Sequence, residues 1–187
     1  MPDDAKSTAS VNRVIKSLVD NRHNIIALKE FYAMQHALVK PDGHTYAQII
    51  RTYTRKNNWF KILGLFDTME REGVVPNAST YSMAIRQLTQ QRQWAKALEL
   101  FWKYASEARP SAEAPSDDKE GLMHNALNAC NRGGRWEGAL QVLAWALKQG
   151  LDPCTVAFTT FVSTCARSGN WALALSTLSR MESDGGL

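Results

Sequence analysis

Four tryptophans, Trp59, Trp94, Trp136 and Trp171, recur at intervals of 35, 42 and 35 residues. The middle interval is one period plus seven residues, so a single register runs through the chain with one short insertion. A fixed period of this length is typical of stacked-repeat proteins, in which each repeat is one supersecondary unit. We therefore expect function to lie along a repeated surface rather than in a single pocket.

The register divides the chain into an N-terminal tail, 1–7, and five units: 8–42, 43–77, 78–119, 120–154 and an incomplete 155–187. Apolar residues recur at i, i+4 and i+7 in the first half of each unit, which is the spacing of one helix face. They are Val11, Ile15 and Leu18; Tyr46, Ile50 and Tyr53; Tyr81, Ile85 and Leu88; Met123, Leu127 and Cys130; and Phe158, Val162 and Cys165. Each unit is thus predicted to begin with an amphipathic helix.

The tryptophan position opens a second helix in each unit, and its apolar stripe has three columns. The columns are Ala27, Ile62, Ala97, Ala139 and Ala174; Leu28, Leu63, Leu98, Leu140 and Leu175; and Phe31, Phe66, Phe101, Leu143 and Leu178. We expect the tryptophans to be packing residues and not a base-stacking platform. Cys130 and Cys165 share one register position, which predicts small buried side chains. Residues 106–118, rich in Ser, Pro and acidic residues, are predicted to be an exposed insertion.

Two helices in 35 residues, with an early aromatic and a closing Pro-Asp or Pro-Asn, resemble the pentatricopeptide repeat (PPR) family. HTYAQIIRTYTRKNNWFKILGLFDTMEREGVVPN (44–77), WAKALELF (94–101) and WEGALQVL (136–143) carry the resemblance, which spans 8–187. The related tetratricopeptide repeat has a different period and a first-helix pattern that is absent here. The resemblance implies an all-α, right-handed α-solenoid of about five helix-turn-helix repeats. It also implies a groove, lined by the first helices, that binds single-stranded RNA with one base per repeat.

In this family, the residue after the first-helix aromatic and the last residue of the repeat together choose the base. The resemblance therefore implies as base-reading candidates Asn12 with Asp42, Ala47 with Asn77, Ser82, His124 with Cys154, and Thr159. Asn12 with Asp42 is a combination that the family associates with uracil. The other units depart from the usual combinations, and the clamping valine that the family places second in the repeat is present only as Val156.

Basic residues recur in the same register. Lys16, Arg51 and Arg86 are spaced by 35, four residues after the base-choosing position and therefore on the same helix face. Arg55, Arg132 and Arg167 follow four residues later, where the family often has a lysine near phosphate. These six side chains are candidates for contacts to an RNA backbone. The alternative is that these side chains simply solvate the exposed faces of their helices and bind no ligand.

Other classes of function have little support in the sequence. There are 22 basic and 18 acidic residues, so the charge permits an anionic partner without requiring one. No apolar run approaches the ~20 residues of a membrane span, and the four histidines lack metal-ligand spacing. No catalytic motif, cofactor or metal site is expected. No presequence is visible in MPDDAKSTAS, yet the resemblance points to an organelle, the mitochondrion first and the plastid second.

Two functions follow from these observations. The first is a non-catalytic protein that binds single-stranded RNA in organellar RNA stabilisation, processing, editing or translation. The second is a structural scaffold that contacts other proteins of a large ribonucleoprotein, such as a mitochondrial ribosome. The departures from the family's base-reading combinations favour the second function, whereas the register of the cations favours the first.

Overall fold

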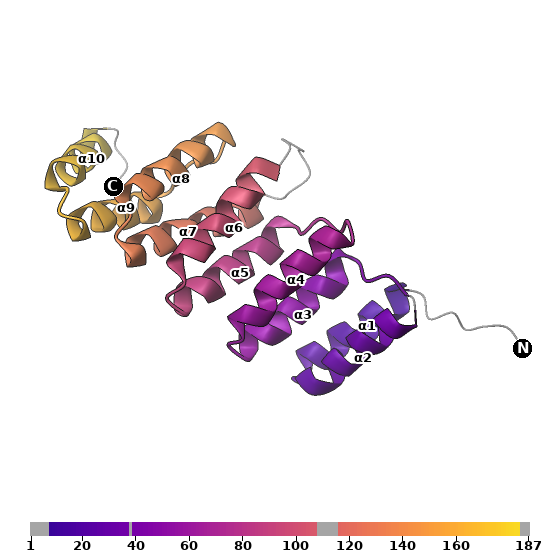
Figure 1. The fold of residues 1–187 in the computed structure, drawn as a ribbon. Helices are drawn as coiled ribbons and strands as arrows, with labels where there is room; N and C mark the ends of the chain where they lie inside the picture. The colour runs from indigo at the N-terminus through magenta and orange to yellow at the C-terminus, as the bar shows by residue number, and fades with distance from the viewer. Residues whose placement is uncertain (1–7, 38, 108–115, 184–187) are drawn as a thin grey trace, which may run out of the picture. The chain divides into compact units, whose positions relative to one another are not determined.

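The computed structural model describes residues 8–37, 39–107 and 116–183, so the tail 1–7 lies outside the described residues. This described part contains ten α-helices and no strand (Figure 1). The helices are α1 (Thr8–Asp20), α2 (Asn24–His36), α3 (Gly43–Arg55), α4 (Trp59–Arg71), α5 (Ala78–Gln90), α6 (Trp94–Glu107), α7 (Ser116–Gly133), α8 (Trp136–Lys148), α9 (Thr155–Arg167) and α10 (Trp171–Ser183). The predicted alternation of first and second helices is present throughout, and every second helix from α4 on begins at its tryptophan.

Side chains just before the helices account for several of the helix starts. The carboxylate of Asp42 accepts a hydrogen bond from the Thr45 backbone N–H at 2.9 Å, and the Thr45 hydroxyl accepts one from the Asp42 N–H at 3.2 Å. Asn58 accepts from the Lys61 N–H at 3.2 Å, and Asn77 accepts from the Thr80 N–H at 2.9 Å. Each bond satisfies an N–H that has no partner within the helix, which stabilises the helix start by about 1 kcal/mol.

The turn between the two helices of a repeat has the same backbone conformation in all five units. The residue fourteen positions after the first residue of each unit has a positive φ, between 54° and 79°. These residues are Arg22, Asn57, Arg92, Gly134 and Gly169. Where glycine occupies this position, the sequence predicts the turn. Where arginine occupies it, the sequence does not indicate a positive φ, because residues with side chains rarely adopt this conformation.

By its contacts the chain divides into two compact units, Met1–Ala84 and Ile85–Leu187. In the first unit, α1 to α4 and the start of α5 enclose a core that includes Ile15, Phe31, Tyr46 and Ile62. Phe31 packs edge-on against Tyr46 with ring centroids 5.6 Å apart. Burying such side chains contributes about 1.5–3 kcal/mol each.

In the second unit, the rest of α5 and α6 to α10 bury the small-residue column, with Ala97, Ala139 and Ala174 at most 3 % exposed. Cys130 and Cys165 are fully buried, as predicted, and both are free thiols. Phe101 meets Trp145 edge-on at 5.1 Å, so the buried tryptophan of this unit is one outside the repeating column.

Three predictions about packing are corrected by the structure. The repeating tryptophans are only partly buried, and Trp171 is 62 % exposed, because the first residue of a helix lies at the rim of the packed face. Leu140 and Leu175 are exposed as well, so the leucine column is not a uniform core stripe. Residues 116–118, expected in the insertion, belong to α7, while 108–115 and the Leu178 side chain lie outside the described residues.

Within the described residues, no helix combines the length and apolar character needed to cross a membrane.

Candidate nucleic-acid interface

The strongest candidate pair from the sequence forms a direct contact in the first unit. Asn12 on α1 donates its amide to both carboxylate oxygens of Asp42 at 2.9 Å, and its carbonyl oxygen accepts from the Thr45 hydroxyl at 2.5 Å. These partners fix the orientation of the amide, because only one assignment of its oxygen and nitrogen satisfies all of them. An amide has two N–H donors and two acceptor lone pairs. The two Asp42 oxygens belong to one carboxylate and subtend a small angle at the Asn12 nitrogen, so they share a single N–H. One donor and one acceptor site of Asn12 therefore remain for a ligand.

Asp42 is held as a carboxylate by the same contacts. Burial raises the pKa of Asp42, but hydrogen bonds from the Thr45 backbone, the Thr45 hydroxyl and the Asn12 amide outweigh it, so the pKa is lowered overall. The usual pKa is about 3.9, so Asp42 is ionised at neutral pH. It remains an acceptor that keeps Asn12 in place.

The closing residue of a repeat is also the residue that precedes the next first helix. Asp42 precedes α3, Asn77 precedes α5 and Cys154 precedes α9. Asn77 caps α5 through Thr80, but the residue opposite in the reading register is Ala47, which offers no polar group. Cys154 makes no side-chain cap, yet its sulfur lies 3.6 Å from His124 Nε2.

The two remaining base-reading candidates are Ser82 and Thr159. Ser82 is half-buried in α5, and the insertion displaces the residue that would pair with it. Thr159 is exposed, and its hydroxyl donates to the Val156 carbonyl of its own helix at 3.0 Å. The structure therefore brings together Asn12 with Asp42 and His124 with Cys154.

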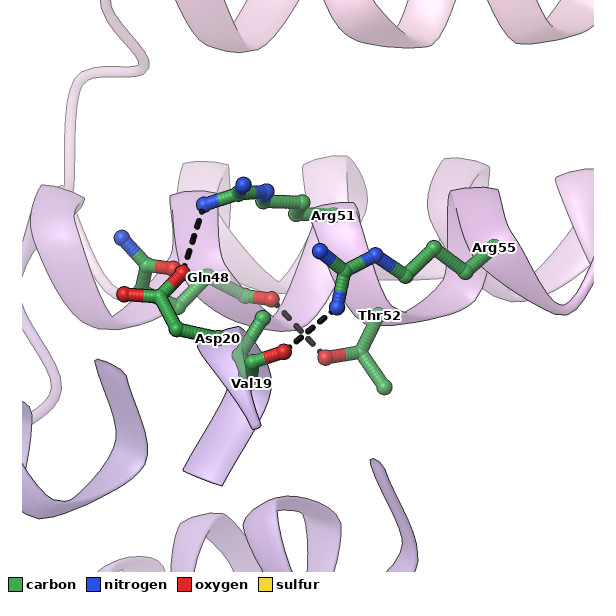
Figure 2. A network of polar contacts seen from close by, with 6 residues as sticks. All are labelled: Val19, Asp20, Gln48, Arg51, Thr52 and Arg55. Carbon is green, nitrogen blue, oxygen red and sulfur yellow. Dashed lines mark hydrogen bonds and ion pairs between the residues drawn. The ribbon is translucent and has the colours of Figure 1, made fainter. Parts of the chain in front are cut away.

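Two of the candidate cations of the first unit, Arg51 and Arg55, have partners within the protein (Figure 2). Arg51 forms an ion pair with Asp20 at 3.1 Å, with both side chains nearly half exposed. Arg55 donates to the Val19 backbone carbonyl at the end of α1. The last carbonyls of a helix lack partners within the helix and carry partial negative charge, so a guanidinium is stabilised there. Lys16 is exposed on α1.

The second unit repeats the arginine contact at the same register. Arg167 donates to the Asn131 carbonyl at 3.4 Å, 36 residues back, as Arg55 does to Val19. A guanidinium has five N–H donors, so a contact to one carbonyl leaves others for an anion. These arginines thus join successive first helices and still present charge to solvent.

An open polar pocket of about 700 Å³ surrounds this contact. It contains two cations expected from the sequence, Arg132 and Arg167, together with Gln90, Arg92, Trp94, Asn128 and Asn131. Arg92 was missed by the sequence analysis because it belongs to a turn and not to a helix face. Arg92 occupies the turn position with positive φ that recurs in every repeat. Arg86 is exposed on α5.

In the parts of the chain that the structure describes, no group of three or more His, Cys, Asp or Glu side chains is arranged to hold a metal ion. His124 and Cys154 form a pair only. Besides this pair and the Asp42 carboxylate, the polar side chains named for the candidate interface are amides, hydroxyls and cations. Their chemistry is that of hydrogen bonding and charge compensation.

Comparison with known families places repeats in both units of the chain. A model described as "Pentatricopeptide repeat domain" matches residues 31–89, and one described as "PPR repeat" matches residues 156–186. No curated protein matches the sequence significantly.

Solved structures share the fold. The crystal structure of the pentatricopeptide repeat protein PPR10 from maize is similar with a TM-score of 0.53 and 18 % identity, over 97 % of this chain and 30 % of that one. PPR10 in complex with an 18-nt psaJ RNA element is similar with a TM-score of 0.51 and 18 % identity, over 97 % of this chain and 34 % of that one. The chain thus spans about a third of the solved proteins it resembles, and the likeness identifies an all-α helical-repeat solenoid.

Proposed function

We propose that this chain, which is a pentatricopeptide repeat protein, binds single-stranded RNA through its first helices. The observation that carries the proposal is the Asn12 amide, fixed by Asp42 and Thr45 with one donor and one acceptor left over. The Watson–Crick edge of uracil presents an N–H donor beside carbonyl acceptors. An amide of fixed orientation is complementary to that edge, and loss of such a contact typically costs about 1–3 kcal/mol of discrimination.

The backbone of the RNA would be held by the cations that the repeats place at equal register. Arg51 is compensated by Asp20, but an exposed ion pair contributes only about 0–1 kcal/mol, so a phosphate competes with it readily. Arg132, Arg167 and Arg92 around the polar pocket supply the same chemistry in the second unit. Four to six phosphate contacts to a single strand predict a log–log salt dependence of affinity with a slope of roughly −3 to −4.

Fluorescence anisotropy with labelled oligouridine, oligocytidine, oligoadenosine and duplex RNA tests this proposal. We expect single strands to be preferred, and the preference for oligouridine to fall in Asn12→Ala. Asn77→Ala is the matched control, because it removes a helix cap at the same repeat position that has no amide opposite. Equal affinity of wild type and Asn12→Ala for every RNA would remove Asn12 from the interface.

The ion pair offers a second, electrostatic test. Asp20→Asn is expected to strengthen RNA binding, because it releases Arg51 and removes a negative charge, whereas Arg51→Glu is expected to weaken it. Both effects should shrink as salt increases, since contacts to phosphate release counterions. A salt-independent affinity in the wild type would refute the backbone contacts.

The process we propose is organellar RNA metabolism, namely stabilisation, processing, editing or translation, without catalysis by this chain. The support is the family and the absence of a catalytic motif in the sequence. We place the protein in the mitochondrion, with the plastid as the alternative. Microscopy of the full-length natural protein fused to a fluorescent protein tests this, and a signal outside both organelles would contradict it.

A structural scaffold in a ribonucleoprotein is the second candidate. Ala47 and Thr159 favour it, because the first offers no polar group and the second bonds to its own helix. Sedimentation of the protein with a large particle after ribonuclease treatment would support the scaffold. Release of the protein by ribonuclease would support the RNA-binding function instead.

A further inference from the structure

A groove between the second helices α2 and α4 of the first unit has no part in the proposed RNA interface. Its volume is about 540 Å³, within the range of ligand-binding pockets. Phe31 and Tyr53 line it as buried side chains, while Tyr32 on α2 and Phe60 on α4 are exposed. The Tyr32 and Tyr53 hydroxyls lie 3.2 Å apart, so α2 is tied to α3 beneath the groove. None of the lining residues is a base-reading or backbone candidate.

Two residues of this groove, one helical turn apart on α4, are not explained by the fold. Gly64 lies mid-helix, where glycine costs up to about 1 kcal/mol relative to alanine, yet a Cβ at this position would meet no atom within 4 Å. The same register position in the other units holds Lys29, Glu99, Gln141 and Ser176. Phe60 is 71 % exposed, although burying an aromatic ring would stabilise the protein.

Both residues make sense if another molecule approaches α4 closely. Glycine leaves the helix backbone accessible, because no side chain stands between the backbone and a ligand. An exposed phenylalanine next to it offers an anchor of the kind that dominates binding energy at protein interfaces. The floor of tyrosine and phenylalanine has the aromatic composition that such interfaces favour.

The charged side chains of the groove define the polarity of the partner. The Thr68 hydroxyl donates to the Gly64 carbonyl at 2.8 Å and accepts from Arg71 Nη2 at 3.2 Å, so Arg71 is held back along α4 toward Gly64. Glu72, the carboxylate of the lining, already accepts from the Tyr46 hydroxyl at 2.6 Å. Lys61 and Arg71 are therefore available to carboxylates of a partner, about 15 Å apart along the helix.

We propose that this groove docks an acidic, amphipathic helix of a partner protein, with an apolar side chain seated over Gly64 and carboxylates on Arg71 and Lys61. This is the helix-in-groove mode of recognition. It is independent of the proposed RNA binding, because the two sites share no residue.

Nuclear magnetic resonance of the full chain, with labelled backbone amides, tests the proposal directly. The probe is an acetylated peptide of about twelve residues with leucines on one face and glutamates near both ends. Control peptides replace the glutamates by lysines or the leucines by serines. We expect saturable shifts at Phe60, Gly64 and Tyr32 with the first peptide only, and the same shifts in the presence of oligouridine.

Substitutions then separate docking from folding. Gly64→Leu is expected to weaken the acidic peptide at least about tenfold, whereas Glu99→Leu, the same register position on α6, leaves its affinity unchanged. Phe60→Ala should also weaken the peptide with little change in Tm, and Gly64→Ala should raise Tm by roughly 2–4 °C. Absence of saturable shifts, equal responses to all three peptides, or shifts at these residues caused by oligouridine would overturn the proposal.

Discussion

Asp42 both caps α3 and holds the Asn12 amide of the proposed RNA site, and the effect of its removal on stability can be calculated. Asp42→Ala removes the cap of α3, which is worth about 1 kcal/mol. It also removes the acceptor of the part-buried Asn12 amide, a loss of about 1 kcal/mol more. The sum of about 2 kcal/mol corresponds to a decrease in Tm of roughly 4–8 °C for a chain of this size.

The structure provides a matched control for each part of this sum. Asn77→Ala removes a cap with no amide opposite, so it should cost about half as much. Asp42→Asn retains a good capping residue, so the helix start should be nearly unaffected. A double-mutant cycle between Asn12→Ala and Asp42→Ala isolates the contact itself, with an expected coupling of about 1 kcal/mol.

Thermal and urea unfolding, followed by circular dichroism, measure these differences. The reasoning fails if Asp42→Ala and Asn77→Ala lower stability equally and the cycle gives zero coupling. In that case the contact of Asn12 with Asp42 would contribute nothing to the free energy of unfolding, and the amide would not be held in place. The same variants in the RNA assay then show whether a fixed amide is required for discrimination.

Three further predictions concern other parts of the chain. Arg22→Gly should stabilise the protein by up to about 1 kcal/mol, and Gly134→Ala should destabilise it by a similar amount, because both residues have a positive φ; calorimetry measures both changes. Cys154→Asp should raise Tm by roughly 2–4 °C, because it supplies the cap that α9 lacks; an unchanged Tm would contradict this. Burial raises the pKa of Cys130 to about 12 and also raises that of Cys165, so in the folded protein only the exposed Cys154 should react with iodoacetamide at neutral pH. Mass spectrometry of labelled peptides before and after denaturation checks this, and labelling of Cys130 in the folded protein would contradict it.

The periodicity of the sequence was sufficient to predict the helices because the apolar residues recur at helical spacing in every repeat. Ala27, Ala97 and Ala139 are buried where the register places them, and four of the five first helices begin at the first residue of the predicted unit. The exception is α7, which begins at Ser116, four residues before the predicted unit. Periodicity could not predict how far each column is buried. The tryptophan column lies at the rim because a first helical residue faces the turn, which depends on the packing of neighbouring helices and not on spacing.

The site was less predictable for a different reason. The register assigned Arg51, Arg55 and Arg167 to one function, but the partners of a long side chain depend on what lies within its reach. Asp20 at the end of α1 is the partner of Arg51, and backbone carbonyls near the ends of first helices are the partners of Arg55 and Arg167. Both come from the previous repeat, 31 to 36 residues away in sequence. No pattern within one helix reveals them.

The closing position of the repeat shows why candidate base-reading residues cannot be interpreted from residue type alone. Asp and Asn are favoured before any helix because they cap it, so their presence at this position first reflects the requirements of the next helix. The proposed base contact needs in addition an amide opposite from the preceding repeat, as Asn12 is opposite Asp42. Asn77 caps α5, but Ala47 in the preceding repeat offers it no polar side chain. Cys154 contacts His124, but its side chain does not cap α9. Ala47→Asn should therefore add a polar partner opposite the existing Asn77 cap and create a second position that discriminates between bases. The measurement is the affinity for RNAs that differ at one base, among which the variant should show a new preference. Unchanged preferences would show that Asn77 serves only as a helix cap.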